Sequence, residues 1–311
     1  MKKITIVIPV FCEEQSLPFF WNNLLSVVND LISFEFTFIF VNDGSEDSTF
    51  EILLNFSRMD SRVKIIDFSR NFGKEVALVA GAVNAKDFDA LITIDCDMQH
   101  PPVLILEMLQ RWESGAEIVV ALRTENLGHS TFRKYASNKF NFVMNKISHT
   151  EFKKGSTDFR LYDKKIINEF VKFRERIRTF RSLIDWMGFT KDYIYFSAPE
   201  RLYGISNYSK IKLLKLALDG FTTFTLLPLK IIGLLGLIIM STSLCLLTFM
   251  LYGYFFSDVP MYTPLAIFVV INTFLVGLIL IVLGLLALYI GNIQTEVLGR
   301  PLYIIRKIIN E

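Results

Sequence analysis

The sequence contains few of the residues that form disulfides or bind zinc. It has 3 cysteines and 3 histidines in 311 residues. The cysteines are far apart and match no zinc-binding spacing, so we expect free thiols rather than a disulfide framework. The histidines also lack a partner at ligand spacing, which disfavours a zinc site built on them. The residues concerned are Cys12, Cys96, Cys245, His100, His129 and His149.

Two common phosphate-binding loops are also missing from the sequence. No GxGxxG follows the first apolar run, and no GxxxxGK[ST] occurs anywhere in the chain. Both loops cradle phosphates with glycine-rich backbone at a helix start. If the chain binds a nucleotide, we therefore expect it to do so with a metal ion rather than with a glycine loop.

Charge is absent from two long stretches near the end of the chain. Residues 231–257 and 259–295 contain no Asp, Glu, Lys or Arg, and the mean hydropathy of the whole chain is +0.40. Each stretch exceeds the roughly 20 apolar residues that a membrane-spanning helix needs. The sequence therefore predicts two transmembrane helices joined by a short connection near Asp258.

Basic residues flank these stretches, and the connection between them contains none. The positive-inside rule then places both ends of the chain in the cytoplasm. The opening MKKITIVIPV leads into a polar helix, so we expect no signal peptide. The same basic residues suit anionic lipid, and with no recognised binding motif we expect no nucleic-acid partner. They are Lys210, Lys212, Lys215, Lys230, Arg300, Arg306 and Lys307.

The chain therefore divides into a soluble part and a membrane part. Residues 129–148 carry one apolar stripe, which suits either an interfacial helix or a helix packed on the domain core. We expect a cytosolic domain over 1–205, a juxtamembrane amphipathic helix over 206–228, two transmembrane helices within 229–295 (about 231–256 and 265–290), and a basic cytosolic tail over 296–311.

Apolar runs rich in β-branched residues alternate with segments of helical length over the first 122 residues. This alternation predicts an α/β fold with a mostly parallel sheet covered on both faces. Ligands of such sheets bind beyond the carboxyl ends of the strands. The expected strands are 4–10, 36–41, 63–68, 90–94 and 117–122, and the expected helices are 14–30, 46–59, 73–85 and 102–114.

Two carboxylates follow the strand expected at 90–94. Asp95 and Asp97 are separated by one residue, and a bend after the strand would bring them together. Mg²⁺ or Mn²⁺ is commonly held by one or two carboxylates plus substrate phosphates and water, and Gln99 could add a neutral oxygen. A solvated acidic turn explains the same residues. Their place at the ligand-binding edge favours the metal site.

Six motifs together resemble one enzyme family. They occur in the order and at about the spacing found in the family 2 glycosyltransferases that act on polyprenyl phosphates, and the two apolar stretches fit as well. The resemblance is strongest to bactoprenol glucosyl transferases, relatives of dolichyl-phosphate mannose synthase. The motifs are PVFCEE (9–14), VNDGSEDST (41–49), SRNFGKEVALVAG (69–81), DCDMQHPP (95–102), GSTDFRLYDKK (155–165) and ERLYGISNYS (200–209).

The resemblance implies a GT-A fold, Rossmann-like with a mostly parallel sheet, and a role for each matched residue. Departures from the family occur at Cys12, Met98 and Asn207, and the last puts one phosphate contact in doubt. By resemblance, Pro9, Phe11, Glu13 and Asp43 meet the base and ribose; Asp95, Asp97 and Gln99 form the diphosphate and metal site, with Mg²⁺ or Mn²⁺; Cys96 also belongs to the nucleotide-sugar-binding residues; Asp158 lies near the acceptor and is catalytic together with Asp97; Arg123 and Arg201 contact phosphate oxygens.

The reaction that the resemblance implies is inverting transfer of a sugar from a nucleotide-sugar to undecaprenyl phosphate. UDP-glucose is the favoured donor. A phosphate monoester has a second pKa of about 6, so the acceptor is already largely ionised in the cytosol. Asp158 then serves to orient the acceptor or the sugar rather than to remove a proton, although the base role stays open.

Other functions suit parts of the same pattern. A processive polysaccharide synthase shares the early motifs but carries a QxxRW motif, which this sequence lacks. A non-catalytic membrane protein that binds a nucleotide-sugar is the second alternative. For the transferase we expect a multi-pass protein of the bacterial inner membrane, in contact with the lipid bilayer, that forms a homo-oligomer.

Overall fold

The computed structural model describes residues 1–124, 153, 155–173, 180–197 and 297–310, together with scattered positions between 248 and 294. The chain divides into two units, one of Met1–Asn207 with Pro301–Glu311 and the other of Tyr208–Arg300. Among the described residues, no helix is long and apolar enough to cross a membrane. The helices expected over 129–148 and 206–228 lie outside the described residues, and those expected over 231–256 and 265–290 lie largely outside them.

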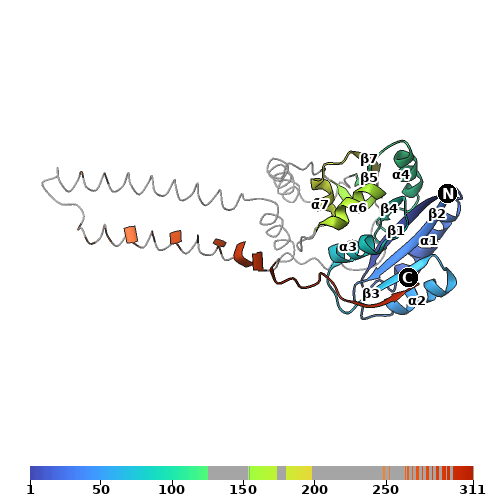
Figure 1. Ribbon diagram of the computed structural model, residues 1–311, viewed down its shortest axis with the longest axis horizontal. Coiled ribbons are helices and arrows are strands. Elements are labelled where there is room, and N and C mark those ends of the chain that lie inside the picture. The colour runs from blue at the N-terminus through green and yellow to red at the C-terminus, as the bar shows by residue number, and fades with distance from the viewer. Residues whose placement is uncertain are drawn as a thin grey trace. The chain divides into compact units, whose positions relative to one another are not determined.

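The described part of the first unit is built on a mixed sheet of 8 strands in the order β7-β5-β6-β4-β1-β2-β3-β8. Strands β1, β2, β3 and β4 are mutually parallel and alternate along the chain with helices, as predicted (Figure 1). The strands are β1 (Lys2–Val10), β2 (Phe34–Asn42), β3 (Val63–Phe68) and β4 (Ala90–Thr93), and the helices are α1 (Leu17–Asn29), α2 (Thr49–Met59), α3 (Lys74–Asn84) and α4 (Leu104–Glu113).

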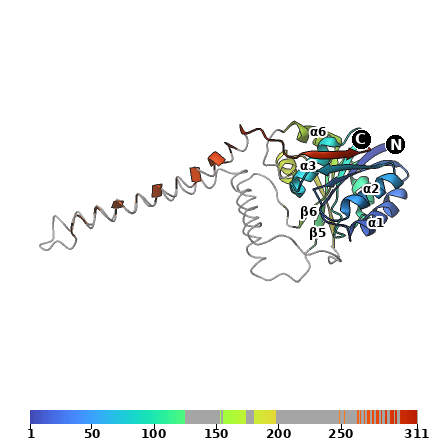
Figure 2. The ribbon, with the colours of Figure 1, turned by 90° about the horizontal axis from the view of Figure 1, so that it is seen from below.

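Helices cover both faces of this sheet, which explains why its central strands are continuous apolar runs. In β1 every residue from Ile4 to Val10 is buried. Ile4, Ile6 and Ile8 face the core shared with α1, α2 and α4, whereas Val7 on the other face meets Gly81 of α3. Figure 2 shows α1 and α2 on one side of the sheet and α3 on the other. The predicted two-sided α/β sheet is confirmed.

The second half of the sheet departs from simple alternation. Strand β5 (Ile118–Arg123) was expected, but β6 (Ser156–Asp163) inserts between β4 and β5 and runs antiparallel to both. Helices α6 (Lys164–Lys172) and α7 (Phe180–Trp186) and strand β7 (Lys191–Phe196), parallel to β5, follow. No strand was expected within the motif GSTDFRLYDKK (155–165), because its alternating polar residues lack the apolar run of a central strand.

The last strand comes from the far end of the chain. Residues 296–311 were expected as a basic tail, but Ile305–Ile309 form β8, which pairs antiparallel with β3 at the edge of the sheet. Charged residues are typical of an edge strand, since one side of it faces solvent. A short charged strand of this kind gives little periodic signal in the sequence, so its pairing depends on the fold.

Gly44 joins two strand-end loops at close range, so we expect Gly44→Ala to destabilise the fold. Its φ is +68°, and an added Cβ would lie 2.4 Å from the backbone carbon of Arg70. Left-handed backbone and the clash together should lower the free energy of unfolding by about 2–5 kcal/mol. Gly188 has φ +76° with nothing within 4 Å of a Cβ, so Gly188→Ala should cost about 1–2 kcal/mol. Urea unfolding of both variants followed by circular dichroism measures the difference. Equal losses would contradict the close-approach argument.

Candidate active site

The loops that follow the first three strands are bonded to one another at the carboxyl edge of the sheet. The backbone N–H of Cys12 donates to the hydroxyl of Ser45 at 2.9 Å. Asp43 accepts from the backbone N–H groups of Phe72 at 2.7 Å and Gly73 at 2.9 Å. Burial raises the pKa of Asp43, and these two hydrogen bonds oppose the rise. Asp43 was predicted to contact the base or ribose of the nucleotide-sugar. Its carboxylate also fixes the loop that precedes α3.

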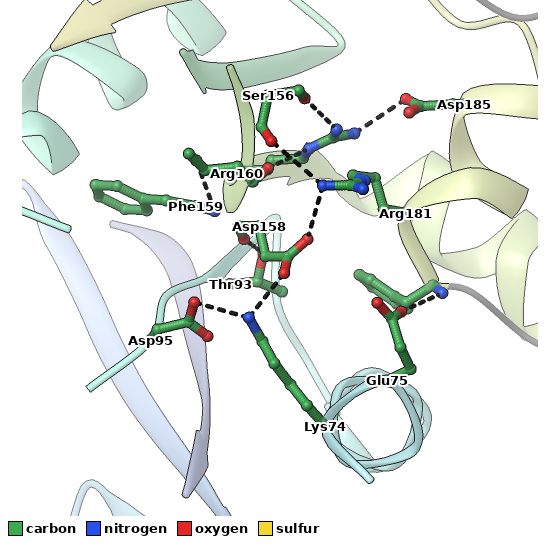
Figure 3. A network of polar contacts seen from close by, with 12 residues as sticks. Lys74, Glu75, Thr93, Asp95, Ser156, Asp158, Phe159, Arg160, Arg181 and Asp185 are labelled. Atoms are coloured by element: carbon green, nitrogen blue, oxygen red, sulfur yellow. Dashed lines mark hydrogen bonds and ion pairs between the residues drawn. The ribbon is translucent and has the colours of Figure 1, made fainter. Parts of the chain in front are cut away.

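Lys74 joins the two acidic motifs of the sequence. Its ammonium nitrogen lies 2.7 Å from Oδ2 of Asp95, after β4, and 2.7 Å from Oδ2 of Asp158, in β6 (Figure 3). The guanidinium of Arg181, from α7, lies 3.5 Å from the other oxygen of Asp158. Figure 3 shows the side chains of Lys74, Asp95, Asp158 and Arg181 pointing toward one another. Two carboxylates and two cations thus form one compact cluster.

The cluster holds Asp158 in its charged form. Burial alone would raise the pKa of Asp158, but Lys74 and Arg181 bring that pKa well below its usual range. Burial alone would likewise lower the pKa of Lys74, but Asp95 and Asp158 raise it well above the ordinary value. A carboxylate that holds its proton so weakly is a poor general base at neutral pH. The electrostatics of the cluster therefore favour an orienting role for Asp158.

A second layer of polar contacts fixes the backbone around Asp158. The buried guanidinium of Arg160 donates to Asp185 at 3.0 Å, to the hydroxyl of Ser156 at 2.7 Å and to the carbonyl of Thr157 at 2.9 Å. The hydroxyl of Thr93 donates to the carbonyl of Asp158 itself at 2.5 Å. A buried Arg is stable only when its donors are satisfied in this way. These bonds hold β6 and α7 together, so Asp158 and Arg181 are presented on a rigid support.

The DCD stretch bends after β4, as expected. Met98 has a positive φ of +62°, and the carboxylate of Asp97 accepts the backbone N–H of Gln99 at 3.1 Å. Between the two acidic residues, Cys96 points into the core, where its thiol lies 3.7 Å from the carbonyl of Pro9. Burial, together with nearby carboxylates, raises the pKa of this thiol well above its usual value. The side chain of Cys96 is therefore a neutral thiol packed in the core.

A buried histidine lies beside Asp95, one of the two carboxylates expected to hold a divalent cation. The Nδ1 atom of His100 is buried 3.5 Å from Oδ2 of Asp95 and makes no hydrogen bond to any residue that the structure describes. Burial lowers the pKa of His100, so the ring is neutral. An unpaired polar atom beside a carboxylate marks a place where a further polar ligand or water would be stabilised. The described residues contain no group of three or more His, Cys, Asp or Glu arranged for a metal, so a cation held by Asp95 and Asp97 would have to take its other ligands from phosphate and water.

The remaining residues that the sequence predicted for the site lie in the loop after β1, at the end of β5 and outside the described residues. Phe11 is exposed, and the Glu13 carboxylate accepts a hydrogen bond from the hydroxyl of Ser16. Arg123 ends β5, where its backbone N–H donates to the carbonyl of Gly155 at 2.8 Å. Arg201 lies outside the described residues. The predicted residues that the fold brings into one cluster are thus Asp95 and Asp158.

Sequence reasoning missed two members of the cluster. Lys74 belongs to the motif SRNFGKEVALVAG (69–81), to which no site residue was assigned, and the structure places it between two carboxylates. Its position after Gly73, at the start of the helix after β3, was the available signal. Arg181 lies in a short helix outside every motif, and no local pattern identifies it.

Comparison with known proteins decides the family. The sequence profile described as Glycosyl transferase family 2 matches residues 5–171. The chain belongs to glycosyl transferase family 2. It is therefore a glycosyltransferase, as predicted, and its sheet is a GT-A-like α/β fold.

Relatives match this glycosyltransferase over nearly its whole length. It is 38% identical to the uncharacterized glycosyltransferase YkcC of Bacillus subtilis, over 97% of this chain and 93% of the relative. It is 34% identical to an SfII prophage-derived bactoprenol glucosyl transferase of Shigella flexneri, over 98% of each chain. It is 33% identical to a prophage bactoprenol glucosyl transferase homolog of Escherichia coli, over 98% of this chain and 99% of the relative.

Proposed function

We propose that this glycosyltransferase moves a sugar from a nucleotide-sugar to a polyprenyl phosphate, with UDP-glucose as the favoured donor and undecaprenyl phosphate as the acceptor. One observation carries the proposal. The similarity to bactoprenol glucosyl transferases extends over 98% of the chain, so it includes the uncharged stretches 231–257 and 259–295 as well as the catalytic motifs. A relative that shared the family domain alone would not match there.

The residues at the carboxyl edge divide the work of binding between them. Asp95 and Asp97, with Gln99, would hold Mg²⁺ or Mn²⁺ against the diphosphate of the donor. A cation bound there neutralises charge on the leaving group. Lys74 and Arg181 offset the negative charge of Asp95 and Asp158 in the same region, which lowers the repulsion that these carboxylates would exert on an anionic donor and acceptor.

The reaction needs no covalent intermediate and no proton removal. An ionised oxygen of the acceptor phosphate attacks the anomeric carbon, forming a carbon–oxygen bond there. The bond between that carbon and the donor diphosphate breaks, and the nucleoside diphosphate leaves with the electron pair. Since attack and departure occur on opposite sides of the carbon, the configuration inverts. Asp158, held ionised by Lys74 and Arg181, orients the acceptor or the sugar for this step.

We also propose a membrane location for the chain. Two uncharged stretches, each longer than a bilayer-spanning helix requires, are flanked by basic residues. They support a transmembrane hairpin in the bacterial inner membrane, with the catalytic domain and both termini on the cytoplasmic side. We propose that the chain acts there as a homo-oligomer.

A donor panel tests the proposed reaction. Membranes that contain the full chain are incubated with undecaprenyl phosphate, Mg²⁺ and either UDP-glucose, UDP-N-acetylglucosamine, UDP-galactose or GDP-mannose. We expect mass spectrometry to detect one sugar added per lipid, and the UDP-glucose reaction to give the most product. A polymer would indicate a processive synthase instead. If no donor gives product although nucleotide binds, the chain is a non-catalytic binding protein.

A further inference from the structure

A chain of hydrogen bonds runs from the last strand of the protein to the loop after the first. We propose that Arg306, in β8, is a positioning residue for the nucleotide-sugar donor and acts through Asp67, Asn42 and Ser45 on the backbone of Cys12. This proposal rests on the proposed function, since it assumes that a donor binds at the carboxyl edge of the sheet. No sequence motif points to it, because Arg306 lies 239 residues from Asp67.

A bulge in the sheet aims Arg306 at its partner. Asp67 pairs with Lys307, but the next residue, Phe68, pairs with Ile305, so Arg306 is the extra residue on β8. Such bulges redirect a side chain and recur beside active sites. The two terminal nitrogens of Arg306 lie 3.4 Å from Oδ2 of Asp67 and 2.8 Å from the carbonyl of Ser69.

Other contacts hold the strand in this register. The ring of Tyr303 stacks on Phe68 with ring centres 5.1 Å apart, and the side chain of Asn310 donates to the carbonyl of Val63 at 3.0 Å. The backbone N–H of Ser69 also donates to the carbonyl of Ile304 at 2.9 Å. The bulge is therefore bounded on both sides, which fixes the backbone from which the side chain of Arg306, 59% exposed, reaches Asp67.

Asp67 connects Arg306 to the buried side chain of Asn42. Its side chain is 2% exposed, and its Oδ1 accepts the Asn42 amide at 2.7 Å. The carbonyl oxygen of the same amide accepts the Ser45 hydroxyl at 2.6 Å and the Ser45 backbone N–H at 3.3 Å. The carboxylate can only accept and the Ser45 N–H can only donate, so the amide of Asn42 has one satisfactory orientation. Each donor and acceptor of this relay between Asp67 and Ser45 is therefore fixed.

The relay ends on an unusual backbone. Cys12 has φ +53°, a left-handed conformation that residues other than glycine seldom adopt, and its N–H donates to the Ser45 hydroxyl. Phe11 and Glu13 flank Cys12, and the loops 11–14 and 43–45 follow β1 and β2 at the edge where α/β sheets bind ligands. Without Arg306, the buried Asp67 would lose its cationic partner, and its carboxylate would hold Asn42 less firmly, which would loosen the contacts of Asn42 and Ser45 that support this kink.

Nucleotide binding measures the relay directly. We would titrate the purified full chain with UDP and with GDP by calorimetry, in the presence of Mg²⁺, for the wild type, Arg306→Gln and Arg306→Lys. Arg306→Gln should weaken binding of the preferred nucleotide about two- to fivefold, the factor expected for one ion pair with an exposed arginine. Arg306→Lys should recover part of the loss. The donor KM should rise by the same factor as the dissociation constant, while kcat and the acceptor KM stay unchanged.

Lys307 provides the matched control, because it lies in the same strand and carries the same charge. Lys307→Gln should bind nucleotide as the wild type does. Ser45→Ala breaks the relay at its far end, so the double variant Arg306→Gln/Ser45→Ala should bind no more weakly than the weaker single variant. Additive losses would overturn the relay, as would unchanged binding by Arg306→Gln. A wild-type chain that binds neither nucleotide would overturn the proposed function, and the donor role of Arg306 with it.

Discussion

Asp97→Asn should reduce sugar transfer by about 10²- to 10³-fold, the loss expected when a stabiliser of transition-state charge is removed. The structure places Asp97 in the bend after β4, with its carboxylate on the backbone N–H of Gln99. Asn keeps the size and a carbonyl oxygen but removes the charge that a divalent cation requires. Asp95 is a less clean target, because its substitution would also remove a partner of Lys74 and so disturb Asp158.

Asp87→Asn is the matched control for this substitution. Asp87 precedes β4, at the opposite end of the strand, and its side chain is 75% exposed. The Asp87→Asn variant should retain wild-type turnover. The measurement is the initial rate of lipid-linked sugar formation at saturating donor, with and without EDTA, followed by readdition of Mg²⁺ or Mn²⁺. EDTA should bring the wild type down to the level of Asp97→Asn. Unchanged wild-type turnover in EDTA would rule out the metal role and leave the family assignment intact.

Asp158→Asn should lower kcat by about 10²-fold, the size of loss that misplacement of a reacting group produces, and leave the shape of the pH profile unchanged. Lys74 and Arg181 depress the pKa of Asp158 below its usual range, so this carboxylate stays ionised from pH 5 to pH 9. The acceptor phosphate has its second pKa near 6. The rate should therefore rise from about pH 5 to pH 7 and then level off, in the wild type and in the variant alike.

A general base would behave differently. If Asp158 removed a proton, its loss would abolish or shift the acid limb of the profile, and that result would overturn the orienting role. The measurement is kcat against pH with undecaprenyl phosphate and the best donor. Asp192→Asn is the control, because it removes a β7 carboxylate from a half-exposed ion pair with Arg111 of α4. It should keep both the rate and the profile of the wild type.

Local patterns in the sequence were sufficient to predict the first half of the fold. Buried parallel strands need continuous apolar runs, and the helices between them need amphipathic segments of 10 or more residues, so both are visible in short windows. The runs 4–10 and 90–94 became β1 and β4 with small shifts at their ends. The same rule placed Asp95 and Asp97 at the ligand edge, because a strand's position in a parallel sheet fixes where its last residue lies. Composition alone likewise marked the two uncharged stretches.

Tertiary structure decided which charges meet. Lys74 contacts Asp158 across 84 residues, and Arg306 contacts Asp67 across 239. Such pairs depend on the order of strands in the sheet, and neither that order nor the antiparallel insertion of β6 leaves a periodic trace in the sequence. The sequence by itself determined the family, the strands and the acidic pair after β4. The fold alone determined that one lysine holds two carboxylates, and that the last strand supports the first loop, because long-range pairing is a property of the assembled sheet rather than of any segment.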